Sequence, residues 1–125
     1  MSPIEMSKLE TSIRTVLAFH EARNRGDQAG LLALLNEDCS LECPGPAPEG
    51  ELVSGKDAIT QFWLDFCPAG ARMEIEEVFG MGMRCVLRWK LTRVDGSHLR
   101  GVDVVQLKNG LIWKMMTYVK GRPSE

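Results

Sequence analysis

The sequence predicts a single α+β domain in which a curved antiparallel sheet packs against N-terminal helices. Helical periodicity dominates before residue 68, and strand-like alternation dominates after residue 71. Two turn dipeptides, Asp95-Gly96 and Asn109-Gly110, separate the last three strand candidates, which is typical of hairpins. The chain has 125 residues, the size of one domain, 1–125. Because helices precede strands, the order is α+β, and a twisted sheet of this size curls and leaves a concave side.

The first helix is expected from Pro3 or Glu5 to Arg25. Its apolar residues recur at spacings of three and four, which is one face of a helix. These residues are Leu9, Ile13, Val16, Leu17 and His20. Gly26 follows the last turn and is expected to end the helix.

A second helix, Gln28 to Asn36, is expected after the capping residue Asp27. Ser40 to Cys43 is a short strand candidate. The Pro- and Gly-rich stretch from Cys43 to Gly55 is predicted to be a loop.

The third helix is expected to begin near Ser54, whose hydroxyl precedes Asp57 by three residues, and to end before Pro68. It carries three aromatic residues: Phe62, Trp63 and Phe66. They either line a pocket or belong to an ordinary core between the helix and the sheet.

Four strands are expected after the helices. Their predicted ranges are Arg72 to Phe79, Met83 to Val94, His98 to Leu107 and Leu111 to Lys120. If the Asp95-Gly96 hairpin has a two-residue loop, Val94 pairs with Ser97, and Arg88 lies opposite Asp103.

That register divides the hairpin between two faces. The first carries Val86, Arg88, Lys90, Thr92, Leu99, Gly101, Asp103 and Val105. The second carries Cys85, Leu87, Trp89, Leu91, Arg100, Val102, Val104 and Gln106. The second face is strongly apolar and must be covered. We expect a homodimer through Leu87, Trp89, Leu91, Val102 and Val104, unless a terminal segment covers them.

Arg88 and Asp103 have two interpretations in this register. They form either an ordinary cross-strand ion pair or a polar spot inside an apolar pocket. His20 is either a core histidine or a pocket acid–base. Cys43 is either a small buried residue or a nucleophile. On the last strand, Trp113, Met115 and Thr117 should share one face. The several methionines of the chain suggest an adaptable pocket lining.

Charge and cysteine content exclude several classes of function. The net charge is −2 and no basic stripe exists, so a nucleic-acid partner is not expected. The four cysteines form no C-x-x-C pair, so no metal site or other cofactor is expected. No signal peptide or membrane span is recognisable, and reduced thiols fit a cytoplasmic protein.

Three motifs resemble the nuclear transport factor 2-like superfamily, and especially its SnoaL-like and ketosteroid-isomerase-like branch. They are G-K-D-A-I at 55–59, R-G-V-D-V-V-Q-L at 100–107 and N-G-L-I-W at 109–113. The resemblance implies a cone-shaped, mixed or antiparallel sheet around three N-terminal helices, a cystatin-like roll. It also implies a cavity for a small apolar molecule.

Residue by residue, the resemblance to ketosteroid isomerases retains one functional group of three. Their buried acidic hydrogen-bond donor falls on Asp103. Their catalytic base falls on Cys43, and their oxyanion tyrosine falls on Phe19. The resemblance to limonene epoxide hydrolases places the arginine of that branch on Arg88, but its two acids fall on Lys90 and Thr117.

The least demanding enzymatic hypothesis is therefore a cofactor-free, SnoaL-like isomerase or cyclase with Asp103 as base, supported by Arg88 and His20. The pocket-lining candidates are Phe19, Cys43, Phe62, Trp63, Phe66, Lys90, Leu99, Gly101, Val105, Trp113, Met115 and Thr117. The alternatives are a non-catalytic ligand-binding or dimerisation module, an epoxide-hydrolase-like use of Arg88 and Asp103, and a protein-interaction domain. Fold alone does not decide among them.

Overall fold

The computed structural model describes residues 2–45 and 50–120. Three helices precede residue 67: α1 (Pro3–Arg25), α2 (Gln28–Ala33) and α3 (Lys56–Phe66). Between α2 and α3 run two strands, β1 (Leu35–Cys43) and β2 (Glu51–Ser54). Four long strands follow: β3 (Arg72–Met81), β4 (Arg84–Thr92), β5 (His98–Lys108) and β6 (Leu111–Lys120). The predicted α+β class is confirmed.

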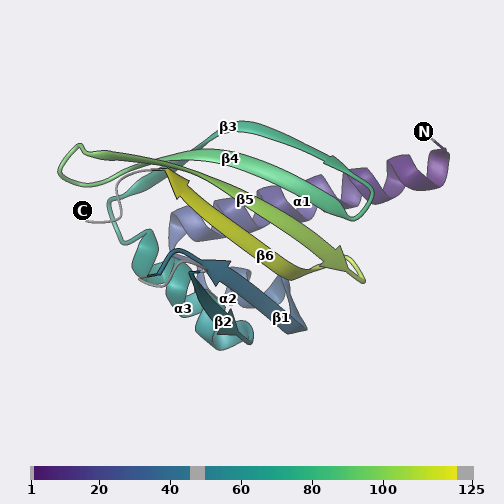
Figure 1. Cartoon of the computed structure of the whole chain (residues 1–125), viewed down its shortest axis with the longest axis horizontal. Helices are drawn as coiled ribbons and strands as arrows, with labels where there is room; N and C mark the ends of the chain where they lie inside the picture. Colours follow the sequence, from purple (N-terminus) through teal and green to yellow (C-terminus); the bar gives the residue numbers. More distant parts are fainter. Residues whose placement is uncertain (1, 46–49, 121–125) are drawn as a thin grey trace.

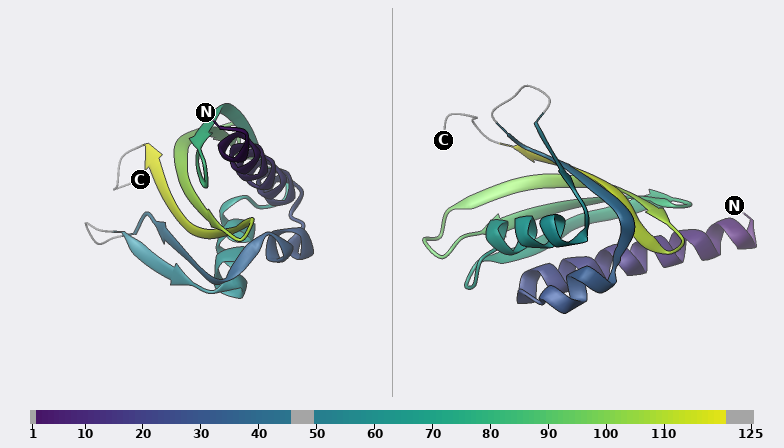
Figure 2. Two further views of the ribbon diagram at one scale, coloured as in Figure 1. Left: turned by 90° about the vertical axis from the view of Figure 1, so that its right-hand side faces the viewer. Right: turned by 90° about the horizontal axis from the view of Figure 1, so that it is seen from below.

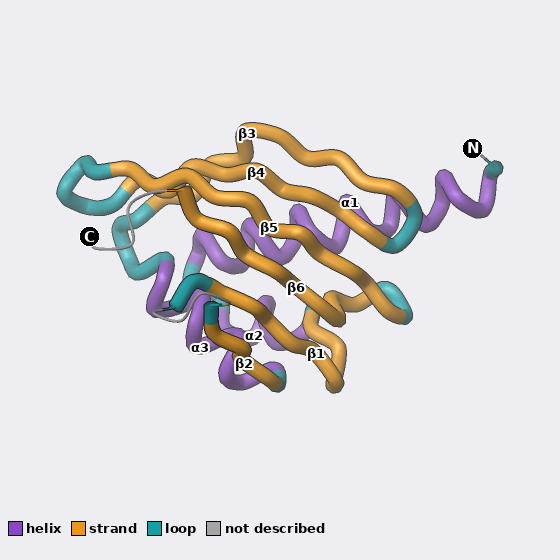
Figure 3. Tube along the Cα trace, in the orientation of Figure 1, coloured by secondary structure: helices purple, strands orange, loops and turns teal. Residues whose placement is uncertain are grey.

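All six strands form one mixed sheet in the order β2-β1-β6-β5-β4-β3 (Figure 3). Every neighbouring pair is antiparallel except β1 and β6, which are parallel. The long helix α1 crosses behind the sheet along β3 and β4, and α3 packs near β1 (Figure 1). The sheet curves around the helices, so its concave side is the covered side (Figure 2).

The core lies between this concave side and the helices. Its largest fully buried apolar side chains come from every layer: Phe19, Leu31, Leu35, Leu41, Ile59, Trp63, Met73, Leu87, Trp89, Leu91 and Ile112. No helix in the described part of the chain is long and apolar enough to span a membrane.

The β4–β5 hairpin differs from its predicted register by one residue. Its loop has three residues, because the Arg93 amide donates to the Ser97 carbonyl at 2.9 Å and Thr92 pairs with His98. The Gly96 amide closes a turn on the Arg93 carbonyl, and Gly96 has φ +87°. A type I turn followed by a left-handed glycine is the usual three-residue hairpin, and Asp-Gly suits it as well as the two-residue form.

This slip exchanges the two faces of β4 relative to β5, because side chains alternate along a strand. Asp103 lies opposite Leu87, and Arg88 lies opposite Val102. The prediction that Leu87, Trp89 and Leu91 form an outer face was wrong: all three are at most 1% exposed and pack under the helices.

Two further boundaries differ from prediction. The second helix ends at Ala33, and β1 begins at Leu35, which pairs with Ile112 of β6. That pairing with a distant strand overrides the local helical pattern. Within the predicted loop from Cys43 to Gly55, residues 51–54 form β2, and positions 46–49 lie outside the described residues.

Helix α3 has Gly55 at its N-cap, with no capping bond from a side chain. The predicted cap Ser54 belongs instead to β2.

Candidate functional site

A buried carboxylate on β5 forms the centre of the concave side. Both side chains of the Asp103–Arg23 ion pair are 1% exposed, and Arg23 Nη1 lies 2.8 Å from Asp103 Oδ2. The other oxygen, Oδ1, accepts from Trp89 Nε1 at 3.1 Å and from Thr117 Oγ1 at 2.9 Å. Side chains from α1, β4 and β6 therefore hold one carboxylate through both of its oxygens.

The sheet register explains how these groups meet. Thr117 lies directly opposite Asp103 on β6, and Trp89 lies opposite Gly101 on β4. A Cβ atom at position 101 would overlap the Trp89 ring. Because Gly101 has no side chain, the indole can lie across β5 and reach Asp103.

Arg23 is held in place by more than Asp103. Its guanidinium carbon lies 4.3 Å from the centre of the Trp63 ring and 5.8 Å from that of Phe19. A guanidinium over an aromatic face is attracted by the ring quadrupole. Arg23 Nε and Nη2 have no hydrogen-bond partner among the described residues.

His20 lies one turn before Arg23 on α1 and is 7% exposed. Burial and then the charge of Arg23 lower its pKa to about 4, while Asp103 opposes the shift. The imidazole is therefore neutral near pH 7, and its Nδ1 is buried without a partner among the described residues.

An aromatic cluster surrounds this ion pair. Trp63 and Phe66 on α3 meet edge to face with centroids 5.5 Å apart, and Phe66 meets Trp89 in the same way at 5.7 Å. Phe62 stacks on Phe66 at 5.7 Å. Such geometries suit aromatic quadrupoles and fix the position of each ring.

Two hollows lie in the described structure, and one of them borders this cluster through Phe66. The hairpin-end hollow has a volume of about 510 Å³ and lies where α3, the segment after it and the β4–β5 hairpin meet. It is lined by Asp65, Phe66, Pro68, Ala71, Leu91, Arg93, Val94, Asp95 and Leu99.

The strand-end hollow, of about 260 Å³, lies where β1 and β6 end. It is lined by Glu42, Cys43, Pro44, Gly50, Met116, Thr117, Tyr118 and Val119. Thr117 therefore connects this hollow to Asp103, and Phe66 connects the hairpin-end hollow to Trp89.

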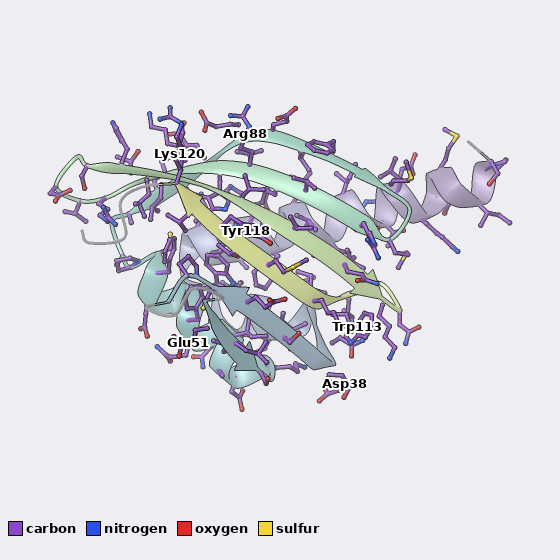
Figure 4. All side chains as sticks on the ribbon, viewed as in Figure 1. Asp38, Glu51, Arg88, Trp113, Tyr118 and Lys120 are labelled. Carbon is purple, nitrogen blue, oxygen red and sulfur yellow. The ribbon has the colours of Figure 1, made fainter. Side chains whose placement is uncertain are left out.

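The predicted partner of Asp103 lies elsewhere. Arg88 is on the convex face, about half exposed (Figure 4), and bonds to Glu77 at 3.2 Å. Lys90 also points outward, because it pairs with Arg100 on the face opposite Asp103. The one-residue slip of the hairpin removes both residues from the concave side.

Trp113 is likewise outside the concave face. Gln106 pairs with Lys114 and Leu107 with Ile112, so a bulge leaves Trp113 without a partner strand residue. Two lysine ammonium groups lie near its ring, with the nitrogen of Lys114 4.5 Å and that of Lys108 5.1 Å from the ring centre. Met115 and Thr117 are buried and do not share its face.

The remaining pocket candidates lie on the concave side or in the helices that cover it. Phe19, Cys43, Trp63, Val105, Met115 and Thr117 are buried, and Phe62, Phe66 and Leu99 are partly buried. Only Cys43, Phe66, Leu99 and Thr117 line one of the two hollows. The others pack into the core, which was the alternative interpretation of the aromatic residues.

Sequence reasoning did not identify Arg23 or Trp89 as site residues. Arg23 follows His20 by three residues on the apolar face of α1, and that spacing was a usable signal. Trp89 was placed on the wrong face by the hairpin register.

Among the described residues, no base that could activate the Cys43 thiol is identifiable. Burial raises the pKa of this thiol, and Glu51 raises it further. Within residues 2–45 and 50–120, no three His, Cys, Asp or Glu side chains gather in a geometry suited to a metal ion.

Comparison with known proteins identifies the family. The model of the SnoaL-like domain matches residues 16–115. The chain belongs to the SnoaL-like family. No curated protein matches the chain significantly.

Solved structures agree with this family. A nuclear transport factor 2-like protein of unknown function from Mesorhizobium loti is 33% identical, with a TM-score of 0.82 over 91% of this chain and 94% of that one. A ketosteroid isomerase-like protein from Kribbella flavida is 19% identical, with a TM-score of 0.80 over 91% of this chain and 81% of that one.

A protein with a cystatin-like fold from Methylobium petroleophilum is 16% identical, with a TM-score of 0.77 over 90% of this chain and 78% of that one. The comparisons with the Kribbella flavida and Methylobium petroleophilum proteins, both under 25% identical, support the fold alone. The predicted SnoaL-like, nuclear transport factor 2-like fold is confirmed.

Proposed function

We propose that this SnoaL-like protein binds a small, largely apolar molecule in the hairpin-end hollow. The observation that supports this most directly is the hollow itself. Its volume of about 510 Å³ falls within the range of about 300–1,000 Å³ that is typical of small-molecule sites. Six of its nine lining residues are apolar, with Phe66, Leu91 and Leu99 among them, and the other three are charged: Asp65, Arg93 and Asp95.

General acid–base catalysis by Asp103 receives little support from the geometry. A general base must reach the proton that it removes. Asp103 is 1% exposed, and both oxygens already accept hydrogen bonds from Arg23, Trp89 and Thr117. We therefore assign Asp103 a positioning role for Arg23. Arg88 cannot assist Asp103 from the convex face, which also weakens the epoxide-hydrolase-like alternative.

His20 meets the same obstacle as Asp103, because it is 7% exposed and lines neither hollow. It is neutral near pH 7, because burial holds its pKa near 4, and its Nδ1 is unpartnered among the described residues. A cofactor-free isomerase or cyclase could use His20 as the proton acceptor only where the substrate reaches this buried ring nitrogen. Its low basicity favours substrates with already acidic protons.

The binding proposal is tested with a neutral apolar dye, Nile red, whose fluorescence rises in apolar sites. Leu99→Trp places a large side chain in the hairpin-end hollow and should weaken binding at least tenfold. Gln106→Trp, on the outward side of the same strand, is the matched control and should bind like the wild type. Equal binding by wild type and Leu99→Trp would contradict the choice of hollow.

We further propose that two copies of the chain pair through the convex face, as a homodimer. An apolar row crosses four strands there, because Phe79 pairs with Val86, Val86 with Val104, and Val104 with Met116. Phe79 at its end is 53% exposed. Tyr118, which is labelled in Figure 4, lies beside the row at 60% exposure.

The area of this face suits a dimer of two identical surfaces. Four strands of nine to eleven residues, about 4.8 Å apart and rising about 3.3 Å per residue, present roughly 600 Å². Specific interfaces bury about 600–1,000 Å² per partner, so this face lies at the lower end of that range. Arg88 and Arg100 are paired with Glu76 and Glu77 of the same chain, so they do not leave unpaired charges beside the row. Of the five residues that the sequence predicted at the dimer interface, only Val102 and Val104 lie on this convex face; Leu87, Trp89 and Leu91 are buried under the helices.

A further inference from the structure

Arg23 offers one complete edge of its guanidinium to a ligand. Nη1 is used by Asp103, whereas Nε and Nη2 are buried and unpartnered among the described residues. These two nitrogens lie on the same edge, and their N–H groups point in parallel. That spacing matches the two oxygens of a carboxylate, which arginine binds bidentately.

Two further buried polar atoms near Arg23 are unpartnered among the described residues. The ring of Trp63, against which Arg23 lies, has its Nε1 donor buried without a described partner. Nδ1 of His20, one turn away on α1, is in the same state. Buried N–H groups in folded proteins almost always have an acceptor. Three unpartnered donors on two touching side chains therefore indicate an acceptor that the described residues do not supply.

We propose that the ligand carries a carboxylate and that this group occupies the Nε–Nη2 edge of Arg23. The inference rests on the proposed function, because the apolar part of the same molecule fills the hairpin-end hollow. It narrows the ligand from an apolar molecule to a monoanionic acid with an apolar body.

The net charge of the site favours a monoanion. Arg23 already faces one carboxylate, Asp103, and His20 is neutral near pH 7. A phosphate group would place close to two negative charges beside Asp103, with only one guanidinium to compensate. A carboxylate adds one charge and matches the planar edge.

Phe66 separates the hollow from Arg23. Its ring lines the hollow and contacts Trp63 and Trp89, of which the first lies against Arg23 and the second donates to Asp103. Its neighbour Cys67 also lies within the field of Arg23: burial raises the pKa of that thiol, and Arg23 lowers it. Because Arg23 lines neither hollow, the proposal requires the Phe66 ring to move when the ligand binds.

The first experiment needs no variant. Binding of 2-naphthoate, 2-naphthamide and 2-naphthalenemethanol to the wild-type protein is measured by calorimetry at pH 7.5, together with decanoate, decanamide and decanol. Each acid should bind at least tenfold more tightly than its two neutral analogues. Equal affinities within both series would overturn the carboxylate assignment and leave the apolar site intact. Absence of binding by all six would contradict the proposed function and the inference together.

The second experiment assigns the preference to Arg23. Arg23→Lys keeps a positive charge beside Asp103 but removes the planar fork, and it should abolish the tenfold preference. Arg88→Lys, on the convex face, is the matched control and should keep it. Trp63→Phe keeps the ring and removes the Nε1 donor, so acids should weaken by about threefold and neutral analogues should not.

The Trp63→Phe variant keeps the test decisive if Arg23→Lys does not fold. If Arg23→Lys folds and still prefers acids over neutral analogues as strongly as the wild type, the assignment is overturned. If Arg23→Lys does not fold, the same result with Trp63→Phe overturns it.

Discussion

Arg23 and Asp103, which are 80 positions apart in the chain, form a 2.8 Å ion pair in which both side chains are 1% exposed. A buried ion pair is costly to desolvate, and removing one partner leaves an uncompensated charge. The pair joins the end of α1 to the middle of β5. It is therefore both a structural link and the support of the proposed ligand site.

Asp103→Asn should destabilise the fold strongly. It leaves the buried charge of Arg23 without its partner, and the expected loss in the free energy of unfolding is about 3 kcal/mol. Urea denaturation measures it. Glu77→Gln is the matched control, since its partner Arg88 is about half exposed and the loss should stay below about 1 kcal/mol. Equal losses for both variants would contradict the structural role of the buried pair.

Gly101→Ala should disturb Trp89. The added methyl group would overlap the indole, so the ring must move and its hydrogen bond to Asp103 is lost. Overpacking of this kind costs about 1–3 kcal/mol. Urea denaturation measures the loss of stability, and tryptophan fluorescence emission detects the movement of the indole ring. Trp89→Leu removes the ring that the new methyl group would overlap. It should therefore lower the free energy of unfolding less in the Gly101→Ala background than in the wild type. Equal losses in the two backgrounds would refute the proposed contact.

Stability should fall between pH 6.5 and pH 4 because of His20. Its pKa drops from 6.5 to about 4 on folding, so the unfolded chain binds more protons in this range. The stability that neutral His20 contributes is fully present above pH 6.5 and is lost as the pH falls towards 4. The free energy of unfolding falls by about 3 kcal/mol at most over this range.

His20→Gln should flatten this part of the stability profile, measured by urea denaturation at successive pH values. His98→Gln is the control, since His98 is exposed. A wild-type profile in the His20 variant would show that another group causes the loss.

Val104→Lys should convert a dimer into a monomer. Val104 lies in the middle of the apolar row, between Val86 and Met116, and a lysine there places like charges at a two-fold interface. Light scattering coupled to gel filtration should give twice the chain mass for the wild type and the chain mass for the variant. Lys108→Ala, at the end of β5, should stay dimeric. A monomeric wild type at micromolar concentration would refute the dimer.

Local patterns predicted most of the elements correctly. The spacing of Leu9, Ile13, Val16 and His20 predicted a helix that the structure places at Pro3–Arg25. Asn109-Gly110 predicted a tight turn, and both residues have positive φ. The start of β1 at Leu35 was missed, because it depends on pairing with Ile112, which lies far away in sequence. Strand pairing of that kind leaves no local signal.

The sequence by itself determined the α+β class and the family, and it predicted a site at Asp103. Only the tertiary structure decided what surrounds that position. Asp95-Gly96 is compatible with loops of two or three residues, and since strand side chains alternate, one residue of difference exchanged Arg88 for Leu87 opposite Asp103. The actual partner, Arg23, arrives from a helix 80 positions away, and such a contact follows from how the sheet curls around α1, which local spacing does not encode.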